Sequence, residues 1–304
     1  MECIEVMELK PFYKKIIISI FISIVITSPR CVSTCRTQSS YCSTKYPVLL
    51  VHGIAFRDKT FFIRYWGRIP ELLSGKGAVV FTGGQEAYGT IEYNALHLKK
   101  KINEILEKTG AEKVNIIAHS RGGLEARYMI SMNGMENKVA SLTTLSTPHR
   151  GSTMADYIIK RAGDKKIITS IIDFYARIIG DDKPESLNAG KELTTGSMKK
   201  FNEKIKNSSL VYYQSYTSAI DEKFNNPLWK KMYKIVSEKE GPNDGLVSVT
   251  SAKWGVFKGI ASCNGKQLVT HADIVGLHIF SGEDCFNAGE FIAGIVHELK
   301  VAGY

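Results

Sequence analysis

The chain has 304 residues, a formal net charge of +10 and 44% hydrophobic residues, which excludes general disorder and allows one α/β domain with an insertion. The positive charge favours contact with an anionic surface, but no lysine- or arginine-rich run carries interleaved aromatic residues. We therefore expect no nucleic-acid partner.

The first 33 residues have the pattern of an export signal. Lysines precede an apolar run at 16–26, and small residues that suit cleavage follow it. The run is short for a membrane span, so an uncleaved membrane anchor is the alternative. A lipoprotein signal fits less well, because Arg30 directly precedes Cys31. We expect a secreted protein that loses residues 1–33 and begins with a polar lead-in at 34–45.

Export places cysteines in an oxidising compartment, where they can pair. Four remain after cleavage near residue 33, namely Cys35, Cys42, Cys263 and Cys285. Four cysteines allow three connectivities, and the simplest joins Cys35 to Cys42 and Cys263 to Cys285. No Cys-x-x-Cys motif or His/Cys cluster in the sequence indicates a zinc site.

Apolar runs alternate with segments of helical spacing along the rest of the chain. The runs predict strands at 46–51, 78–81, 114–118, 139–145 and 210–217. The helical spacing predicts helices at 61–73, 91–108, 123–132, 201–205 and 291–299. Polar loops precede Asn243 and Val269. This alternation predicts an α/β fold with a mainly parallel sheet and helices on both faces.

Ser120 lies between the expected strand 114–118 and the expected helix 123–132, which is the arrangement of a nucleophile elbow. The sharp turn needs small residues on both sides of the serine, and Ala118 and Gly122 provide them. The usual pattern has glycine at the first of these positions. The alternative is a helix-capping serine in an ordinary turn. The flanking strand and helix favour Ser120 as a nucleophile.

A serine nucleophile needs a histidine base and a carboxylate that orients the base. Among the seven histidines, His271 and His278 fit best, and His271 follows a short apolar segment in a loop. His119 adjoins the serine, but adjacent residues on such a turn point apart. We predict His271.

The acid is expected between the serine and the histidine in chain order. Asp244 lies in an Asn-Asp-Gly turn before an apolar pair, and Asp221 is the competitor, with a surface turn as its ordinary interpretation. We predict Asp244. The backbone N–H groups of Ile54 and Arg121 are expected to form the oxyanion hole, because they follow the first buried strand and the nucleophile.

An insertion at 153–193 interrupts the alternation of strands and helices. Between 165 and 179, isoleucines and aromatic residues recur at three- and four-residue spacing, which predicts an amphipathic helix. We predict that this insertion is a mobile lid over Ser120. An ordinary core helix is the alternative.

Six segments together carry a family resemblance over roughly residues 45 to 300. They are Tyr46-Pro-Val-Leu-Leu-Val-His-Gly, Ala118-His-Ser-Arg-Gly-Gly, Ser146-Thr-Pro-His-Arg-Gly-Ser, Glu185-Ser-Leu-Asn, Asn243-Asp-Gly-Leu-Val and Thr270-His-Ala-Asp. In this order they resemble the bacterial secreted triacylglycerol lipases of the α/β-hydrolase superfamily, with the Pseudomonas and Burkholderia true lipases most similar. The resemblance implies an α/β-hydrolase fold with a helical lid, a Ser120–Asp244–His271 triad and action on acylglycerols at a lipid–water interface.

The resemblance also implies a structural calcium ion near the catalytic histidine. Asp273 matches one calcium ligand of these lipases, but Leu277 replaces another and Asn226 matches a third poorly. The segment from His271 to Gly276 is also similar to the calcium-and-zinc lipases of thermophilic bacilli, although no zinc site assembles around His97. The chemistry itself requires no cofactor. The sequence leaves open a folding chaperone as a partner and the oligomeric state.

These observations predict a secreted serine carboxylic-ester hydrolase, with triacylglycerol lipase as the first expectation. A phospholipase or soluble-ester carboxylesterase on the same fold is the alternative. A non-catalytic hydrolase-fold binding protein at the cell surface is a different class, and the complete set of Ser120, Asp244 and His271 argues against it.

Overall fold

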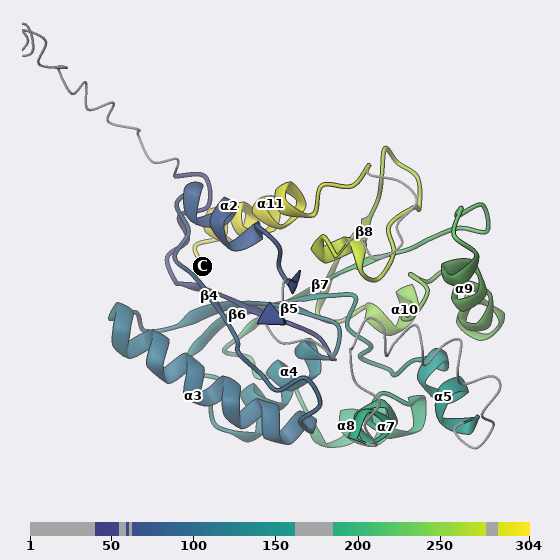
Figure 1. Cartoon of the computed structure of the whole chain (residues 1–304). Helices are drawn as coiled ribbons and strands as arrows, with labels where there is room; N and C mark the ends of the chain where they lie inside the picture. Colours follow the sequence, from purple (N-terminus) through teal and green to yellow (C-terminus); the bar gives the residue numbers. More distant parts are fainter. Residues whose placement is uncertain (1–39, 55–58, 61–62, 162–184, 278–284) are drawn as a thin grey trace, which may run out of the picture. The chain divides into compact units, whose positions relative to one another are not determined.

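The computed structural model describes residues 40–304, except 55–58, 61–62, 162–184 and 278–284. In this part of the chain, one six-stranded parallel sheet has the strand order β4-β1-β5-β6-β7-β8 (Figure 1). Its strands are β1 (Val48–Val51), β4 (Val80–Thr82), β5 (Val114–His119), β6 (Val139–Leu145), β7 (Tyr212–Ser218) and β8 (Val256–Ala261). Every pairing between neighbouring strands is parallel, so the expected parallel sheet is confirmed.

The sheet separates two apolar cores, because side chains alternate between the two faces of a strand. Along β1, Val48 and Leu50 belong to one core, whereas Leu49 and Val51 belong to the other. All four side chains are fully buried. A parallel sheet covered on both faces needs such unbroken apolar strands, which explains the run at 48–51.

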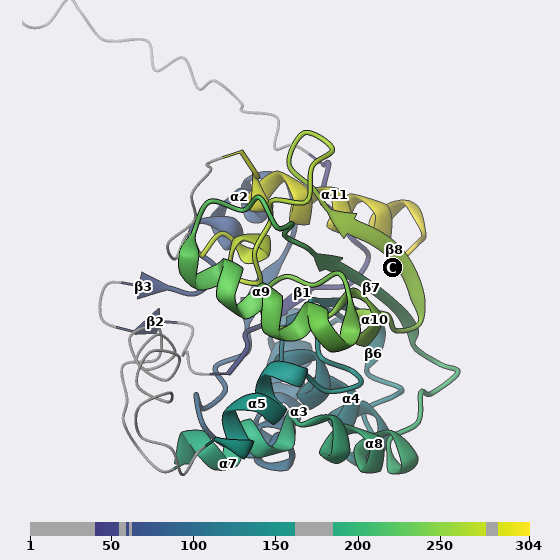
Figure 2. The same cartoon turned by 90° about the vertical axis from the view of Figure 1, so that its right-hand side faces the viewer.

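Helices cover both faces of the sheet, as expected (Figure 1). The first core packs against α2 (Ile69–Gly75) and α11 (Ala288–Val301), and the second packs against α3 (Ile91–Thr109) and α4 (Gly122–Met132). The remaining helices are α5 (Thr153–Lys160), α7 (Glu185–Glu192), α8 (Thr195–Lys204), α9 (Pro227–Glu240), α10 (Val249–Ala252) and the 3-10 helix η1 (Asp273–Val275). Helix α5 packs against α7, α8 and α9 (Figure 2).

Local sequence explains the limits of α3. The Thr90 side chain accepts a hydrogen bond from the N–H of Tyr93, which caps the first turn. Gly110 ends the helix in the left-handed conformation, with φ of 69°. Four of its buried side chains recur at helical spacing, namely Ala95, Leu98, Ile102 and Ile105. The helix expected at 91–108 is therefore present.

The helix expected at 61–73 begins later than the spacing suggested. Ile63–Arg64 forms β3, which pairs antiparallel with β2 (Lys59–Thr60), and α2 begins only at Ile69. Pro70 lies in the first turn of α2, where its fixed φ suits a helix start. The expectation was wrong for the first half of this segment because apolar spacing alone does not locate the start of a helix.

The two stretches that were predicted to be polar loops, before Asn243 and before Val269, contain helices and a strand. Helix α9 lies before Asn243, and α10 and β8 lie before Val269. Asn226 caps α9, which buries Trp229, Met232 and Val236 on one face. The narrowness of this buried face explains why α9 was missed.

The described residues include no helix that is both long and apolar enough to cross a membrane. The expected signal at 1–33 and the expected apolar face at 165–179 lie outside the described residues. Of the insertion at 153–193, the structure describes α5 before the gap and α7 after it.

Candidate active site

Ser120 lies in the turn between β5 and α4, and its φ of 54° is in the left-handed region. The turn is fixed on both sides: the Ser120 N–H donates to the carbonyl of Leu145 at 2.9 Å, and the Thr147 hydroxyl donates to the carbonyl of Ser120 at 2.7 Å. A non-glycine residue at positive φ persists only where its surroundings determine it, and such residues cluster at functional sites. This is the strand–turn–helix arrangement of a nucleophile elbow.

Two glycines make this close packing possible. A Cβ atom at Gly122 would lie 2.3 Å from the carbonyl oxygen of His52, and one at Gly123 would lie 2.3 Å from the Thr147 Oγ1. Both distances are too short for a carbon atom, so contact with neighbouring chain segments requires glycine at both positions.

Asp244 and His271 meet through a direct hydrogen bond. The distance from His271 Nδ1 to Asp244 Oδ2 is 2.9 Å, and Asp244 is fully buried. The other carboxylate oxygen accepts from the N–H groups of Leu246 at 3.0 Å and Val247 at 2.8 Å. Because the carboxylate accepts from Nδ1, His271 Nε2 is left to act as a proton acceptor. Asp221 instead accepts from a neighbouring N–H in an exposed turn.

His119 connects the elbow to the His271 loop. The His119 Nε2 lies 3.0 Å from the carbonyl oxygen of His271, and the two ring centroids are 4.6 Å apart. Since His119 directly precedes Ser120, the elbow and the histidine loop are in contact. The competing His278 lies outside the described residues.

The turn after β1 lies next to Ser120. A Cβ atom at Gly53 would lie 3.4 Å from the Ser120 Oγ, so this turn passes directly beside the hydroxyl. Ile54 follows Gly53. Within the described chain, the N–H groups of Ile54 and Arg121 donate to no other protein group. They are therefore free to donate to a substrate oxygen.

The Arg121 side chain is fully buried in a charged cluster that sequence reasoning missed. Its guanidinium lies 3.3 Å from a carboxylate oxygen of Glu125 and 3.7 Å from one of Glu192, and it also donates to the carbonyl of Gly89. Burial raises the pKa of Glu192, and the charge of Arg121 opposes this. Glu192 is the last residue of α7, so this cluster joins the elbow to the final part of the insertion at 153–193.

Asn94 and Gln85 complete the cluster. The Asn94 amide donates to one oxygen of Glu125 at 2.8 Å, and the Gln85 amide donates to the other at 3.0 Å. Buried charges need such partners, because an unpaired charge in the protein interior is strongly destabilising.

The carboxylate of Asp273, which matches one calcium ligand in the resemblance, forms hydrogen bonds within its own loop. One oxygen of its buried carboxylate accepts from the N–H and hydroxyl of Thr270, and Leu277 is buried nearby in sequence. Among the residues that can be described, no group of three or more His, Cys, Asp or Glu is placed to hold a metal ion. The calcium expectation stays a prediction, which unchanged thermal stability in EDTA together with an absence of bound metal would remove.

The disulfide bond between Cys263 and Cys285 is present, with Cα atoms 5.6 Å apart. The other simple pairing, Cys35 with Cys42, is wrong because Cys42 forms no disulfide. Its sulfur lies fully buried, 3.6 Å from the carbonyl oxygen of Ala293.

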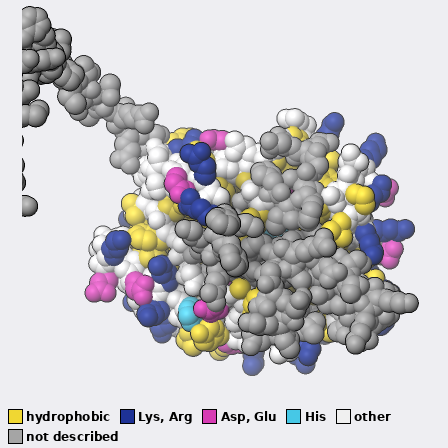
Figure 3. Space-filling model, in the orientation of Figure 1, with side chains coloured by type: hydrophobic (Ala, Val, Ile, Leu, Met, Phe, Trp, Pro, Cys, Tyr) yellow, Lys and Arg dark blue, Asp and Glu magenta, His cyan; other side chains and the backbone are white. Residues whose placement is uncertain are grey.

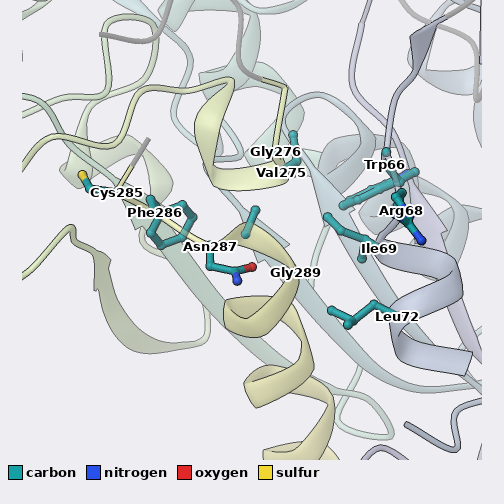
Figure 4. Close-up of a pocket in the computed structure, with 12 residues that line it drawn as sticks. Trp66, Arg68, Ile69, Leu72, Val275, Gly276, Cys285, Phe286, Asn287 and Gly289 are labelled. Atoms are coloured by element: carbon teal, nitrogen blue, oxygen red, sulfur yellow. The ribbon is translucent and has the colours of Figure 1, made fainter. Parts of the chain in front are cut away.

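A cavity of about 460 Å³ lies beside the segment that follows His271 (Figure 4). Its walls come from the start of α2, the end of η1 and the start of α11, and they include Trp66, Ile69, Val275 and Phe286. None of the candidate catalytic residues lines it.

The described part of one molecular face carries lysine and arginine side chains that are spread among acidic and hydrophobic ones (Figure 3). They do not gather into one continuous patch on the described part of this face, and the expectation of no nucleic-acid partner stays a prediction.

Comparison with known proteins agrees with this geometry. The family model described as "alpha/beta hydrolase fold" matches residues 46–162. Triacylglycerol lipase 2 of Saccharomyces cerevisiae is 36% identical over 65% of this chain and 59% of its own length. A triacylglycerol lipase of Burkholderia plantarii is 31% identical over 56% of this chain and 51% of its own. The chain thus spans between half and three fifths of these relatives.

Two solved structures show the same fold at low sequence identity. The mature lipase of Bacillus licheniformis superimposes with a TM-score of 0.61 at 21% identity, covering 78% of this chain and 89% of that one. A metagenomic carboxyl esterase gives 0.64 at 12% identity, covering 86% and 77%. The chain therefore has the α/β-hydrolase fold, and in sequence it is similar to triacylglycerol lipases.

Proposed function

We propose that the protein is a serine carboxylic-ester hydrolase that acts on triacylglycerols. The observation that carries this proposal is the hydrogen bond of His271 to buried Asp244, in a loop that contacts the residue before Ser120. The α/β-hydrolase fold and the similarity to triacylglycerol lipases support the substrate class.

In the proposed mechanism, His271 Nε2 takes the proton of the Ser120 hydroxyl as Oγ attacks the ester carbonyl carbon. Asp244 keeps the proton on Nδ1 and stabilises the imidazolium that forms. The N–H groups of Ile54 and Arg121 donate to the oxyanion. The alcohol leaves with the proton from Nε2, and water then repeats the attack on the acyl-enzyme.

Covalent labelling tests the nucleophile. An organophosphate ester is expected to modify one serine, which peptide mapping should place at 120. Ser120→Ala should lower kcat by about 10⁴-fold or more, as in other serine hydrolases that lose the nucleophile. Labelling at another serine, or normal turnover by this variant, would contradict the mechanism.

Initial rates on emulsified triolein, soluble tributyrin and phosphatidylcholine would test the substrate class. The proposal expects the highest kcat/KM on the triacylglycerols, with triolein hydrolysed at the emulsion surface. Preference for phosphatidylcholine would indicate a phospholipase, and activity confined to soluble esters would indicate a carboxylesterase. Binding without turnover of any ester would indicate the non-catalytic class.

We also propose that the protein is exported and loses residues 1–33. The disulfide bond of Cys263 and Cys285 fits an oxidising compartment. N-terminal sequencing of protein from the culture medium should find a start near residue 34, whereas an intact N-terminus in the membrane fraction would indicate the uncleaved anchor.

The lid also remains a proposal. If the insertion covers Ser120 in water and opens at lipid, the rate should rise more steeply once a short-chain ester exceeds its solubility. Smooth saturation through that limit would favour an ordinary core helix at 165–179.

A further inference from the structure

A chain of three hydrogen bonds runs through the elbow, in a region that the proposed mechanism does not use. The Gly53 N–H donates to the Tyr65 hydroxyl oxygen at 3.0 Å, and that oxygen lies 2.5 Å from His119 Nδ1. The His119 Nε2 lies 3.0 Å from the carbonyl oxygen of His271. Tyr65 and His119 are each only 2% exposed, so water does not compete for these bonds.

Only one assignment of protons fits this chain. A carbonyl oxygen can only accept, so His119 Nε2 must carry a hydrogen. Burial lowers the pKa of His119 well below its usual value, and the charge that His271 can carry lowers it further. The ring is therefore neutral. His119 Nδ1 is then an acceptor, and it accepts from the Tyr65 hydroxyl. Each donor thus faces an acceptor along the whole chain.

The chain joins three loops that are distant in sequence. Gly53 lies in the turn before the proposed oxyanion donor Ile54, His119 directly precedes Ser120, and His271 lies in the loop of the proposed base. The rings also pack: the centroids of Tyr65 and His119 are 5.9 Å apart, and those of His119 and His271 are 4.6 Å apart.

We propose that Tyr65 and His119 are positioning residues, which hold the His271 loop and the turn after β1 in the correct place relative to Ser120. This inference rests on the proposed hydrolase function. Asp244 orients His271 through the ring, whereas His119 fixes its backbone carbonyl. Two separate attachments determine where Nε2 points, and small displacements of a reacting group lower rates strongly.

The neutral state of His119 is part of this role. During the reaction His271 becomes an imidazolium. A positive charge on the neighbouring His119 ring would destabilise that imidazolium by repulsion. A neutral ring that donates to the His271 carbonyl positions the loop without that repulsion.

Two variants interrupt this chain of hydrogen bonds at different residues. Tyr65→Phe keeps the ring but removes the hydroxyl, and we expect kcat on a soluble short-chain ester to fall about 10-fold with KM nearly unchanged. His119→Leu removes both ring hydrogen bonds, and kcat should fall about 100-fold. Phosphonate labelling of Ser120 should slow by the same factors, because it needs the same base.

His119→Gln is the rescue variant. The glutamine amide can donate to the carbonyl of His271, so it should recover about 10-fold of the loss seen with leucine. If glutamine is no better than leucine while both variants remain folded, the role of the donor is contradicted. If His119→Leu unfolds the protein, the kcat values of His119→Gln and Tyr65→Phe relative to the wild type still test the hydrogen-bond chain.

Tyr216→Phe is the matched control. Tyr216 lies on β7 and is also largely buried, but its hydroxyl donates to a Glu298 carboxylate oxygen on α11 at 2.8 Å. We expect a loss of thermal stability similar to that of Tyr65→Phe with kcat unchanged. An equal fall in kcat for both variants would show that buried tyrosine hydroxyls act only through general stability.

Nitrogen NMR of labelled histidine tests the proton assignment in the wild-type protein. We expect a neutral His119 with hydrogen on Nε2 at neutral pH, and it should stay neutral as the pH falls through the usual histidine pKa of about 6.5. Hydrogen on Nδ1 would overturn the assigned directions. If Ser120→Ala is inactive but Tyr65→Phe and His119→Leu retain wild-type kcat, the positioning role fails alone. If Ser120→Ala remains active, the proposed function fails.

Discussion

The two residues on either side of Ser120 are both buried, but they belong to networks of opposite character. His119 is neutral, and its two ring nitrogens form hydrogen bonds with the neutral hydroxyl of Tyr65 and the carbonyl of His271. Arg121 is a cation whose partners include the carboxylates of Glu125 and Glu192. A buried neutral ring needs only its hydrogen bonds, whereas a buried cation needs counter-charges.

Because the two networks differ in charge, we expect mutations in them to have different effects on stability and on turnover. Breaking the charged network leaves an uncompensated charge in the interior, so its main effect should be a lower free energy of unfolding. Breaking the neutral one should affect turnover first, because it fixes a group that reacts.

The largest expected effect on stability comes from Glu125→Gln. It leaves the buried guanidinium of Arg121 with one nearby carboxylate, and we expect a loss of about 3–5 kcal/mol in the free energy of unfolding. Denaturant titration measures it. By contrast, His119→Gln should cost about 1 kcal/mol or less while lowering kcat. Equal stability losses at both positions would remove the distinction between the two networks.

Removal of the disulfide should rank next. Replacing Cys263 and Cys285 with serine opens the loop between two positions that are 22 residues apart in sequence. The larger conformational entropy of the unfolded chain then lowers the free energy of unfolding by about 3 kcal/mol. The bond encloses the His271 loop, so kcat should also fall. The charged cluster should remain intact, and unchanged stability with unchanged kcat would contradict this prediction.

A smaller effect should appear as a dependence of stability on pH. Burial raises the pKa of Glu192, so between the ordinary glutamate value of about 4.5 and the raised value, the folded protein binds more protons than the unfolded one. The free energy of unfolding contributed by this group therefore falls as pH rises through that window. Glu192→Gln should flatten this part of the pH profile in urea titrations, and an unaltered profile would contradict the assignment.

The smallest effect is expected at the surface. Lys101 and Glu104 lie 4.0 Å apart on the exposed side of α3, and Glu104→Gln should change stability by less than about 0.5 kcal/mol. It is the control for Glu125→Gln, because the same chemical change is made without burial.

Local patterns predicted much of the fold. Strand β6 coincides with the expected run at 139–145, because a strand buried on both faces is apolar or small throughout. Helix α9 was missed although its start, Asn226-Pro227, is a recognisable capping sequence. Strand β8 is half-exposed at the sheet edge, so its pattern is weak.

The site was predictable only where its motifs are local. Asp244 and His271 were found from their loops and chain order, but their contact spans 27 residues. The contacts of His119 span 54 residues to Tyr65 and 152 residues to His271. No pattern in one sequence reports such separations, so the network of His119 could be recognised only in the folded chain. The Arg121–Glu125 pair, at a spacing of four residues, is a local signal for part of the other network.

The buried thiol of Cys42 gives the molecule an internal reporter of its own unfolding kinetics. The side chain is inaccessible in the core beneath α11, and burial raises the pKa of its thiol, so very little reactive thiolate reaches an alkylating reagent. The peptide that contains Cys42 should therefore acquire label only when the layer of α2 and α11 opens. At high reagent concentration its labelling rate becomes the opening rate, and at low concentration it reports the opening equilibrium.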